Sequence, residues 1–205
     1  MKVYGLTGGI ATGKSTVEQA LRGLGIPTLD ADVFARRVVE PGQPAHRELA
    51  EEFGAAVLDS AGRIDRPALA RLVYRDPIKR HRLEQITHPR IMAAIWDEVA
   101  GLEREGHPIV VVSAALLVEA DYHRRFDGLV VVWCDAGEQM TRVVARDELD
   151  ENQAQRRIEA QMPMGDKIAV ADWTIDTNGT RGQTAEQVLA LVKEWRRAVP
   201  SSPGA

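Results

Sequence analysis

The sequence is poor in cysteine and in aromatic residues, and it contains no long hydrophobic run. Its single cysteine, Cys134, cannot form an internal disulfide, and we interpret it as a buried core thiol in a reducing compartment. No apolar stretch approaches the roughly 18 to 20 residues that a bilayer span requires, and the N-terminus lacks the apolar segment of a signal peptide. These absences predict a cytoplasmic protein with no membrane partner.

Charge of one sign is not in large excess either. The chain of 205 residues has 26 Lys and Arg against 30 Asp and Glu, a formal net charge of −4, and no long basic tract. A nucleic-acid-binding protein normally carries a basic patch, so we expect no nucleic-acid partner. The length suffices for one sizeable core together with an inserted subdomain.

The most informative motif is a G-x-x-x-x-G-K-S string at residues 8–15. An apolar run precedes it and a helical pattern follows, and this strand–loop–helix context predicts a phosphate-binding loop. Backbone N–H groups and the helix dipole would bind phosphate oxygens of a nucleotide, which we take to be ATP. Lys14 would contact the β- and γ-phosphates, and Ser15 would ligate Mg²⁺. The predicted nucleotide-binding residues of the loop are Gly8, Gly9, Ala11, Thr12, Gly13, Lys14, Ser15 and Thr16.

Strand-like runs alternate with helical patterns along the chain, which predicts an α/β fold with a mainly parallel, buried sheet flanked by helices. We predict five strands, at residues 3–6, 27–29, 109–112, 129–133 and 173–175. Between the second and third strands only helical patterns occur, such as 67–74 after a cap at Asp65, so a helical insertion is expected. The last helix is expected to start at a capping box, Thr184 to Gln187, and to end near Trp195.

A polar block at residues 142–166 has the composition of a mobile helical lid. Arg142 and Arg146 are four residues apart, so on a helix their guanidinium groups share one side. Arginine donors suit the charge that spreads over a phosphoryl group during its transfer. The alternative is a solvated face in which these arginines pair with nearby acidic residues, namely Asp147, Glu148 and Glu151.

Two carboxylates follow the second strand, in Asp30-Ala31-Asp32. Ligands bind at the carboxyl ends of strands in open α/β sheets, so an aspartate here would face the phosphate site. In a small-molecule kinase it would orient the acceptor hydroxyl and take its proton. Alternatively, Asp30 caps the next helix and Asp32 is solvated in its first turn, and the spacing does not decide between the two. A switch GTPase is disfavoured because the guanine-reading N-K-x-D segment is missing.

An ordered series of segments along residues 1–180 resembles the dephospho-coenzyme A kinase family. Besides the loop, the series includes Leu29-Asp30-Ala31-Asp32, Gly62-Arg63-Ile64-Asp65-Arg66, Leu83-Glu84-Gln85-Ile86-Thr87-His88-Pro89, Leu116-Leu117 with Glu119, Arg142, Arg146-Asp147, Gln161-Met162 and Ile175-Asp176-Thr177-Asn178-Gly179. The resemblance implies a P-loop kinase fold with a helical coenzyme-binding insertion and a helical lid. It also implies phosphorylation of the ribose 3′-hydroxyl of dephospho-coenzyme A, with ATP and Mg²⁺.

Site residues and domains follow from the same resemblance. It implies catalytic roles for Asp32, Lys14, Arg142 and Arg146, a place near the adenine for Asn178 and Gly179, and acceptor contacts by Asp32, Arg66, His88, Leu117 and Glu119. A histidine before a proline is, however, more often a helix-boundary residue with a structural hydrogen bond than a ligand. The implied domains are a core at 1–31, 107–141 and 167–198, the insertion at 32–106, the lid at 142–166 and a flexible tail at 199–205.

The chain departs from the family pattern at three places. Ala11-Thr12 replaces the usual Gly-Ser, which we expect to tune the loop without abolishing nucleotide binding. Ala115 and Val118 stand where Pro and Phe are frequent, so the wall of the acceptor pocket would be reshaped. The third strand ends in Ser113 and not in the acidic residue that many P-loop proteins use for Mg²⁺, which leaves the metal on Ser15, phosphates and water.

Two other functions stay open at this point. One is a different P-loop small-molecule kinase of the nucleoside monophosphate or shikimate type, against which the Asp30-Ala31-Asp32 and His88-Pro89 segments argue. The other is a nucleotide-sensing module without catalysis. Turnover with a panel of acceptors would separate all three.

Overall fold

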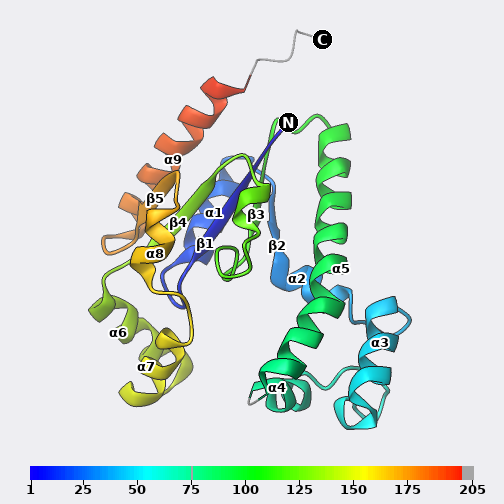
Figure 1. Cartoon of the computed structure of the whole chain (residues 1–205). Coiled ribbons are helices and arrows are strands. Elements are labelled where there is room, and N and C mark those ends of the chain that lie inside the picture. Colours follow the sequence, from blue (N-terminus) through cyan, green and yellow to red (C-terminus); the bar gives the residue numbers. More distant parts are fainter. Residues whose placement is uncertain (75, 200–205) are drawn as a thin grey trace. The chain divides into compact units, whose positions relative to one another are not determined.

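The computed structural model describes residues 1–74 and 76–199 (Figure 1). The chain forms two compact units, one made of residues 1–29 and of those from 102 onward, the other of residues 30–101. Residues 200–205 of the predicted flexible tail lie outside the described residues. None of the described helices is both long and apolar enough to cross a bilayer.

A five-stranded sheet with the order β2-β3-β1-β4-β5 is the centre of the first unit. β1 pairs in parallel with β3 and β4, and β4 pairs in parallel with β5. The β-branched runs of β3 and β4 are buried because the sheet is covered on both faces. The five predicted strands are confirmed with small shifts at their ends, as β1 Lys2–Gly8, β2 Thr28–Asp30, β3 Ile109–Ser113, β4 Leu129–Trp133 and β5 Trp173–Asp176.

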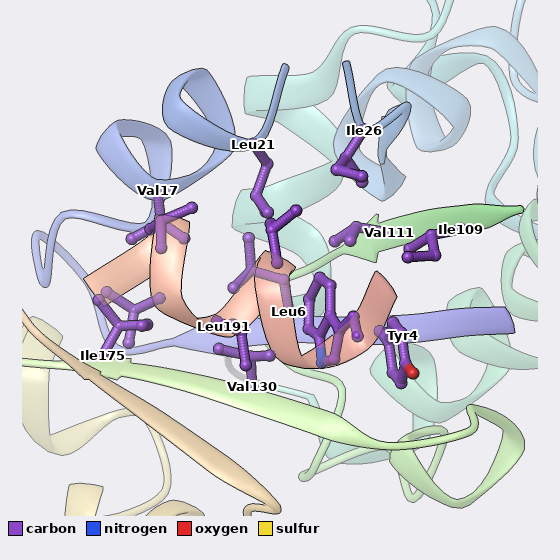
Figure 2. Close-up of a cluster of buried hydrophobic side chains, with 14 residues drawn as sticks. Tyr4, Leu6, Val17, Leu21, Ile26, Ile109, Val111, Val130, Ile175 and Leu191 are labelled. Atoms are coloured by element: carbon purple, nitrogen blue, oxygen red, sulfur yellow. The ribbon is translucent and has the colours of Figure 1, made fainter. Parts of the chain in front are cut away.

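Helices α1 (Lys14–Gly23) and α9 (Arg181–Ala198) pack on the sheet and form the main core with it. Figure 2 shows this core: the side chains of Val17 from α1 and Leu191 from α9 gather with side chains of the strands. Farther along α9, Trp195 is 1% exposed and stacks on Tyr4, with ring centroids 4.2 Å apart. In α1, Val17 and Leu21 are buried, so the helical pattern that follows the loop packs one face on the sheet.

The start of α9 corrects the sequence-based prediction. The capping box is formed by Thr180 and Gln183, four residues before the predicted Thr184 and Gln187. Both pairs fit the same Thr-x-x-Gln pattern, so the pattern alone cannot choose between them. The hydroxyl of Thr184 instead donates to the carbonyl of Thr180, inside the first turn. At its other end the helix continues past Trp195 to Ala198.

Three helices lie between β4 and β5, and a 3-10 turn, η2 (His123–Arg125), lies between β3 and β4. The helices are α6 (Ala136–Asp147), α7 (Glu151–Glu159) and α8 (Met164–Ala169). The predicted lid, 142–166, therefore covers the second half of α6, α7 and the start of α8. Its movement stays a prediction.

The second unit is helical. Its elements are α2 (Ala31–Arg37), α3 (Pro44–Phe53), the 3-10 turn η1 (Ala55–Val57), α4 (Arg66–Tyr74) and most of α5 (Pro77–Arg104). Ala45, Leu49 and Ile86 form a small core of its own. The predicted cap at Asp65 is confirmed, because its carboxylate accepts the N–H of Ala68 at 3.0 Å.

Pro89 lies inside α5, so the prediction of a helix boundary at His88-Pro89 is wrong. A proline inside a helix lacks an N–H donor and crowds the preceding turn. The guanidinium of Arg90 donates to the carbonyl of Ile86 in that turn, and the hydroxyl of Thr87 donates to the carbonyl of Leu83. These bonds add side-chain donors to carbonyls near the proline, although the carbonyl that its missing N–H would have served is that of Gln85.

Candidate active site

The phosphate-binding loop has the backbone that its glycines permit. Gly13 has a φ of 86° directly before α1, and Ala11, with a φ of 57°, is also left-handed. A Cβ on Gly8 would lie 2.6 Å from the carbonyl oxygen of Val132 and 2.7 Å from the hydroxyl of Thr12. Any side chain at Gly8 would therefore push the loop away from β4. Close packing therefore requires glycine at this position.

Two glutamines fix the tip of this loop from outside it. The N–H of Ile10 donates to the side-chain oxygen of Gln161 at 2.6 Å, and its carbonyl accepts from the side-chain nitrogen of Gln139 at 2.9 Å. Sequence reasoning placed Gln161 in the lid block without a role and missed Gln139. No local pattern could have found Gln139, because its partner is more than a hundred residues away in the chain.

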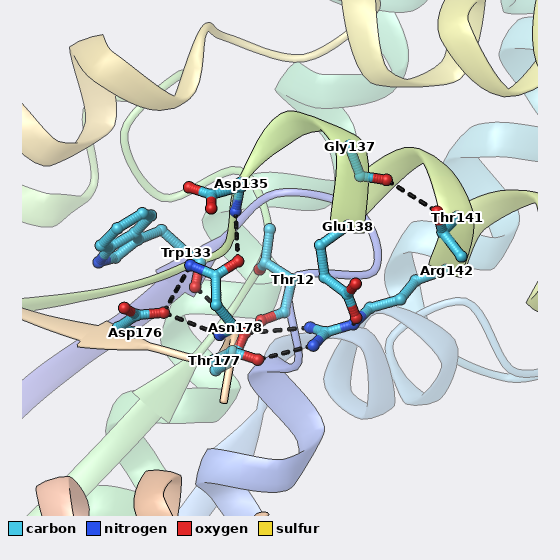
Figure 3. Close-up of polar contacts among 10 residues, drawn as sticks. All are labelled: Thr12, Trp133, Asp135, Gly137, Glu138, Thr141, Arg142, Asp176, Thr177 and Asn178. Atoms are coloured by element: carbon cyan, nitrogen blue, oxygen red, sulfur yellow. Dashed lines mark hydrogen bonds and ion pairs between the residues drawn. The ribbon is translucent and has the colours of Figure 1, made fainter. Parts of the chain in front are cut away.

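Thr177, which follows β5, connects the loop to α6 (Figure 3). Its buried hydroxyl donates to the carbonyl of Thr12 at 2.7 Å. The guanidinium of Arg142 donates to the carbonyl of Thr177 at 2.6 Å and to its hydroxyl at 3.1 Å, and it pairs with Glu138 at 2.8 Å. Arg142 is therefore held in one orientation, which suits a side chain that must meet a ligand without reorganising.

One cavity of about 540 Å³ is lined by half of the predicted nucleotide-binding residues. It is lined by Ala11, Gly13, Ser15 and Thr16 of the loop region, by Gly179, and by Arg142 and Arg146 of α6. Arg181, at the start of α9, also lines it and was not predicted. The structure thus brings the loop and the two predicted arginines around a single space.

Not every predicted nucleotide residue presents its side chain to that space. Thr12 is fully buried, and its hydroxyl donates to the carbonyl of Gly9 at 3.0 Å, which closes the loop on itself. The amide of Asn178 accepts the N–H of Asp135 and donates to Asp176, both at 2.8 Å (Figure 3). These two residues shape the site, and direct contacts with adenine by Asn178 stay a prediction.

Arg146 is engaged by an acidic neighbour. Its guanidinium pairs with Asp147 at 2.8 Å, and Arg157 pairs with the same carboxylate at 2.6 Å. The hydrogen bond from Arg146 holds the pKa of Asp147 below its ordinary value. The alternative interpretation, in which these arginines pair with nearby acidic residues, is therefore confirmed for the pairing with Asp147. Arg146 remains 55% exposed and lines the cavity, so a ligand can still reach it.

Lys14 forms a compact cluster with a residue that sequence reasoning missed. Its ammonium donates to the carboxylate of Glu18 and to the hydroxyl of Ser113, both at 2.7 Å, and Ser113 donates to the same Glu18 oxygen at 2.5 Å. Glu18 is four residues after Lys14 on α1, so the helical spacing was the available signal. Ser113 lies at the end of β3, where the acidic residue was missing.

The two aspartates, Asp30 at the end of β2 and Asp32 in the first turn of α2, belong to the second unit. The carboxylate of Asp30 accepts the N–H of Asp32 at 2.9 Å and caps the helix, as the alternative interpretation expected. Asp32 is exposed in the first turn. This local geometry leaves its carboxylate accessible to solvent and to a ligand.

A second cavity, of about 400 Å³, lies within the helical unit. Its lining is apolar apart from Arg66 and Thr87, and includes Val39, Leu49 and Leu83. Within the described residues Arg66 forms no ion pair. His88, next to Thr87 in α5, is half-buried, and burial lowers its pKa below the ordinary value against the opposing effect of Glu84.

The remaining two predicted acceptor residues have partners inside the first unit. Leu117 is 4% exposed and packs with Leu129 in a satellite core. Glu119 pairs with the fully buried Lys167 at 2.7 Å and accepts the N–H of Met162 at 3.3 Å. Their positions connect the segment after β3 to α8, and an acceptor contact by either stays a prediction.

The fold and this site define a P-loop kinase: a phosphate-binding loop between β1 and α1, on a sheet of this strand order, with arginines of α6 beside the loop. A solved shikimate kinase from Acinetobacter baumannii aligns over 96% of this chain and 95% of its own, with a TM-score of 0.50 and 18% identity. At that identity the likeness concerns the fold alone.

Sequence comparison narrows the class to one family. The family described as dephospho-CoA kinase matches residues 2–183. A dephospho-CoA kinase of Anaeromyxobacter dehalogenans is 42% identical and covers 99% of this chain and 98% of its own length; one of Geobacter metallireducens is also 42% identical, covering 99% and 100%. A solved protein of Thermus thermophilus aligns over 95% of this chain and 97% of its own, with a TM-score of 0.84 and 36% identity. The chain belongs to the dephospho-coenzyme A kinase family, whose members are ATP-dependent kinases.

Proposed function

We propose that this chain transfers the γ-phosphoryl group of ATP to the ribose 3′-hydroxyl of dephospho-coenzyme A and gives coenzyme A and ADP, the last step of coenzyme A biosynthesis. Membership in the family supports the substrates. The observation that carries the proposal is the cavity at the loop, where Gly13 and Ser15 share one space with Arg142 and Arg146.

The loop and α1 bind the nucleotide phosphates. The left-handed Gly13 leads into α1, where Gly13, Ser15 and Thr16 line the cavity, and the helix dipole adds positive potential there. Lys14, in the first turn, supplies a full positive charge to the β- and γ-phosphates. Binding at this site needs no base-specific contact from the loop.

The residues beside the loop also fit Mg²⁺. Ser15 is exposed, lines the cavity and offers a hydroxyl oxygen, the kind of ligand Mg²⁺ takes in proteins. The described residues include no group of three or more His, Cys, Asp or Glu that would hold a metal without help. Such a site matches Mg²⁺ shared between one or two protein oxygens and the phosphates. When bound, Mg²⁺ neutralises charge on the phosphate oxygens.

Asp32 serves as the base in this proposal. Its exposed carboxylate orients the 3′-hydroxyl, whose oxygen bonds to the γ-phosphorus as the bond to the β–γ bridging oxygen breaks. ADP leaves, and the hydroxyl proton passes to Asp32. Asp30 caps α2 and thereby fixes the turn that carries Asp32.

Arg142 and Arg146 stabilise the charge that develops on the transferring group. Arg142 is already oriented by Thr177 and Glu138, so it loses little freedom when it contacts an anion. Arg146 shares Asp147 with Arg157, and that carboxylate keeps a cationic partner when Arg146 turns to the ligand. Two planar, permanently charged donors match the spread of charge over the phosphoryl oxygens.

The acceptor combines a diphosphate with a long, largely uncharged arm. We assign the arm to the cavity of the helical unit, whose lining is apolar, and the diphosphate to Arg66 on that lining. His88 is in α5 beside Thr87, and burial favours its neutral form, so it would contribute a hydrogen bond in place of a charge.

An ADP-release assay with a panel of acceptors tests the function. The panel contains dephospho-coenzyme A, nucleoside monophosphates and shikimate, each at saturating concentration with ATP and Mg²⁺. We expect turnover with dephospho-coenzyme A well above that with the others. Preference for another acceptor would identify a different small-molecule kinase, and ATP binding without turnover of any acceptor would identify a nucleotide sensor.

A cytoplasmic location and the lack of a nucleic-acid partner are part of the proposal. Cys134 is buried in the structure, and burial raises the pKa of its thiol, so it is a poor thiolate nucleophile. This environment suits a core thiol in a reducing compartment.

A further inference from the structure

The end of β3 has a carboxylate beside it that comes from another element. β3 ends in Ser113, but the hydroxyl of Ser113 donates to Glu18, which reaches this point from α1. The side chain of Glu18 is only 8% exposed, and Ser113 is fully buried. A negative charge is thus present where many P-loop proteins place an acidic strand residue, although the sequence of the strand lacks one.

Charge balance at this cluster depends on Lys14. A buried carboxylate is costly unless a cation is close to it, and Lys14 supplies that cation at 2.7 Å. Arg22 is the next nearest cation, at 3.8 Å from the other oxygen of Glu18. An ammonium has three N–H donors, and Glu18 and Ser113 take two of them.

Nucleotide phosphates would change this balance. Lys14 must share its charge with the β- and γ-phosphates, while the carboxylate of Glu18 stays one helical turn away on α1. Phosphate oxygens and a carboxylate repel each other strongly in a partly buried site. A divalent cation bound to Ser15 and the phosphates would remove that repulsion, because it is attracted to both.

We infer that Glu18 makes nucleotide binding dependent on Mg²⁺: its carboxylate disfavours the metal-free nucleotide and favours the Mg²⁺ complex, directly or through a metal-bound water. The inference rests on the proposed binding of ATP with Mg²⁺ and goes beyond it by naming the residue that couples the two. Glu18 is therefore a positioning residue for the metal and for Lys14, and it does not contact the reacting atoms.

Calorimetric titration of ATP and of ADP measures this coupling without turnover. The dissociation constants are determined with EDTA and with excess Mg²⁺. The ratio of the constant with EDTA to the constant with Mg²⁺ is then compared between wild type and Glu18→Gln. We expect the ratio for the variant to be about tenfold smaller than for wild type, chiefly because metal-free nucleotide binds more tightly once the negative charge is gone. Glu186→Gln, on the exposed face of α9, makes the same change in net charge and should leave the ratio unaltered.

A second variant separates charge from mere structure. Ser113→Ala removes the hydroxyl from the cluster but keeps the carboxylate, so the dependence on Mg²⁺ should persist. If both variants reduce the ratio equally, Glu18 acts only by ordering the cluster, and the inference is wrong. An unchanged ratio in Glu18→Gln would also overturn it. If wild type itself binds nucleotide equally well with and without Mg²⁺, the proposed role of the metal fails first, and the inference fails with it.

Discussion

The backbone conformation of Ala11, which the sequence does not reveal, decides what this departure from the family pattern costs the loop. Its φ of 57° lies in the left-handed region, where glycine has no steric penalty. The sequence identifies Ala11 as a departure from the Gly that the family usually carries, but it does not reveal the conformation. Thr12 at the adjoining departure is buried and bonds within the loop. That these two changes leave nucleotide binding intact stays a prediction.

Asp32 is the residue on which the proposed chemistry depends most. Asn at this position keeps the shape and some hydrogen bonding but removes the charge and the proton acceptor. We expect Asp32→Asn to lower the single-turnover rate with saturating dephospho-coenzyme A by roughly 10²- to 10⁴-fold while ATP binding persists. If hydroxyl deprotonation is late in a loose transition state, the effect lies at the lower end of this range.

Asp30→Asn is the matched control. Asn caps helices about as well as Asp, so α2 should keep its start, and the rate should fall far less. An Asp32→Asn enzyme as fast as wild type would show that this aspartate is only a residue of the first helical turn.

At the scale of elements, α9 shows both the strength and the limit of pattern reading. A last helix is correctly predicted here, and its residues Val188, Leu191 and Val192 follow a helical period and are buried. The predicted start is wrong, because two Thr-x-x-Gln patterns follow one another directly, beginning at Thr180 and Thr184. The structure selects the first, and Thr184 is then used inside the helix.

This difference is measurable as stability. Thr180→Ala removes the hydroxyl that accepts the N–H of Gln183, which should cost about 1 kcal/mol of unfolding free energy in denaturant titrations. Thr180→Ser keeps the cap and should be nearly neutral. Loss of stability in the serine variant equal to that in the alanine variant would mean that the methyl group, and not the cap, stabilises this end of α9.

Helix α5 gives a prediction about pH. Because burial lowers the pKa of His88 in the folded protein, the unfolded chain binds its proton more readily. His88 therefore disfavours folding as the pH falls below the ordinary histidine value of about 6.5, whereas above that value it imposes no cost. We expect unfolding curves of wild type to lose stability from pH 7 to 5.5 more steeply than those of His88→Gln. Identical pH profiles would show that His88 does not titrate in this way.

For the whole molecule, the sequence predicts the class of fold well because local signals agree with it. The loop motif, the buried β-branched strands and the helical insertion each follow from short-range patterns, and the strands are found where those patterns place them. The contacts that shape the site escape such reasoning. Each of these contacts joins segments that are far apart in the sequence, so only the folded chain reveals them. They are the hydrogen bonds of Gln139 with Ile10, of Thr177 with Thr12, and of Ser113 with Glu18.

Each of the two compact units contributes different residues to the proposed reaction. The first carries the nucleotide cavity and the arginines, and the second carries Asp32 and the apolar cavity with Arg66. The proposed reaction thus uses residues of both units, and the acceptor is the substrate that the second unit selects. The position at which phosphate is added to the acceptor is consequently the most informative property of the enzyme.

Two deoxy analogues of dephospho-coenzyme A test that position directly. Each is incubated with ATP, Mg²⁺ and the enzyme, and the product is analysed by phosphorus NMR and mass spectrometry. The account predicts that the 2′-deoxy analogue is phosphorylated on its ribose 3′-oxygen and that the 3′-deoxy analogue is not phosphorylated at all. Phosphorylation of the 3′-deoxy analogue would contradict it, because the acceptor hydroxyl would then lie elsewhere on the molecule.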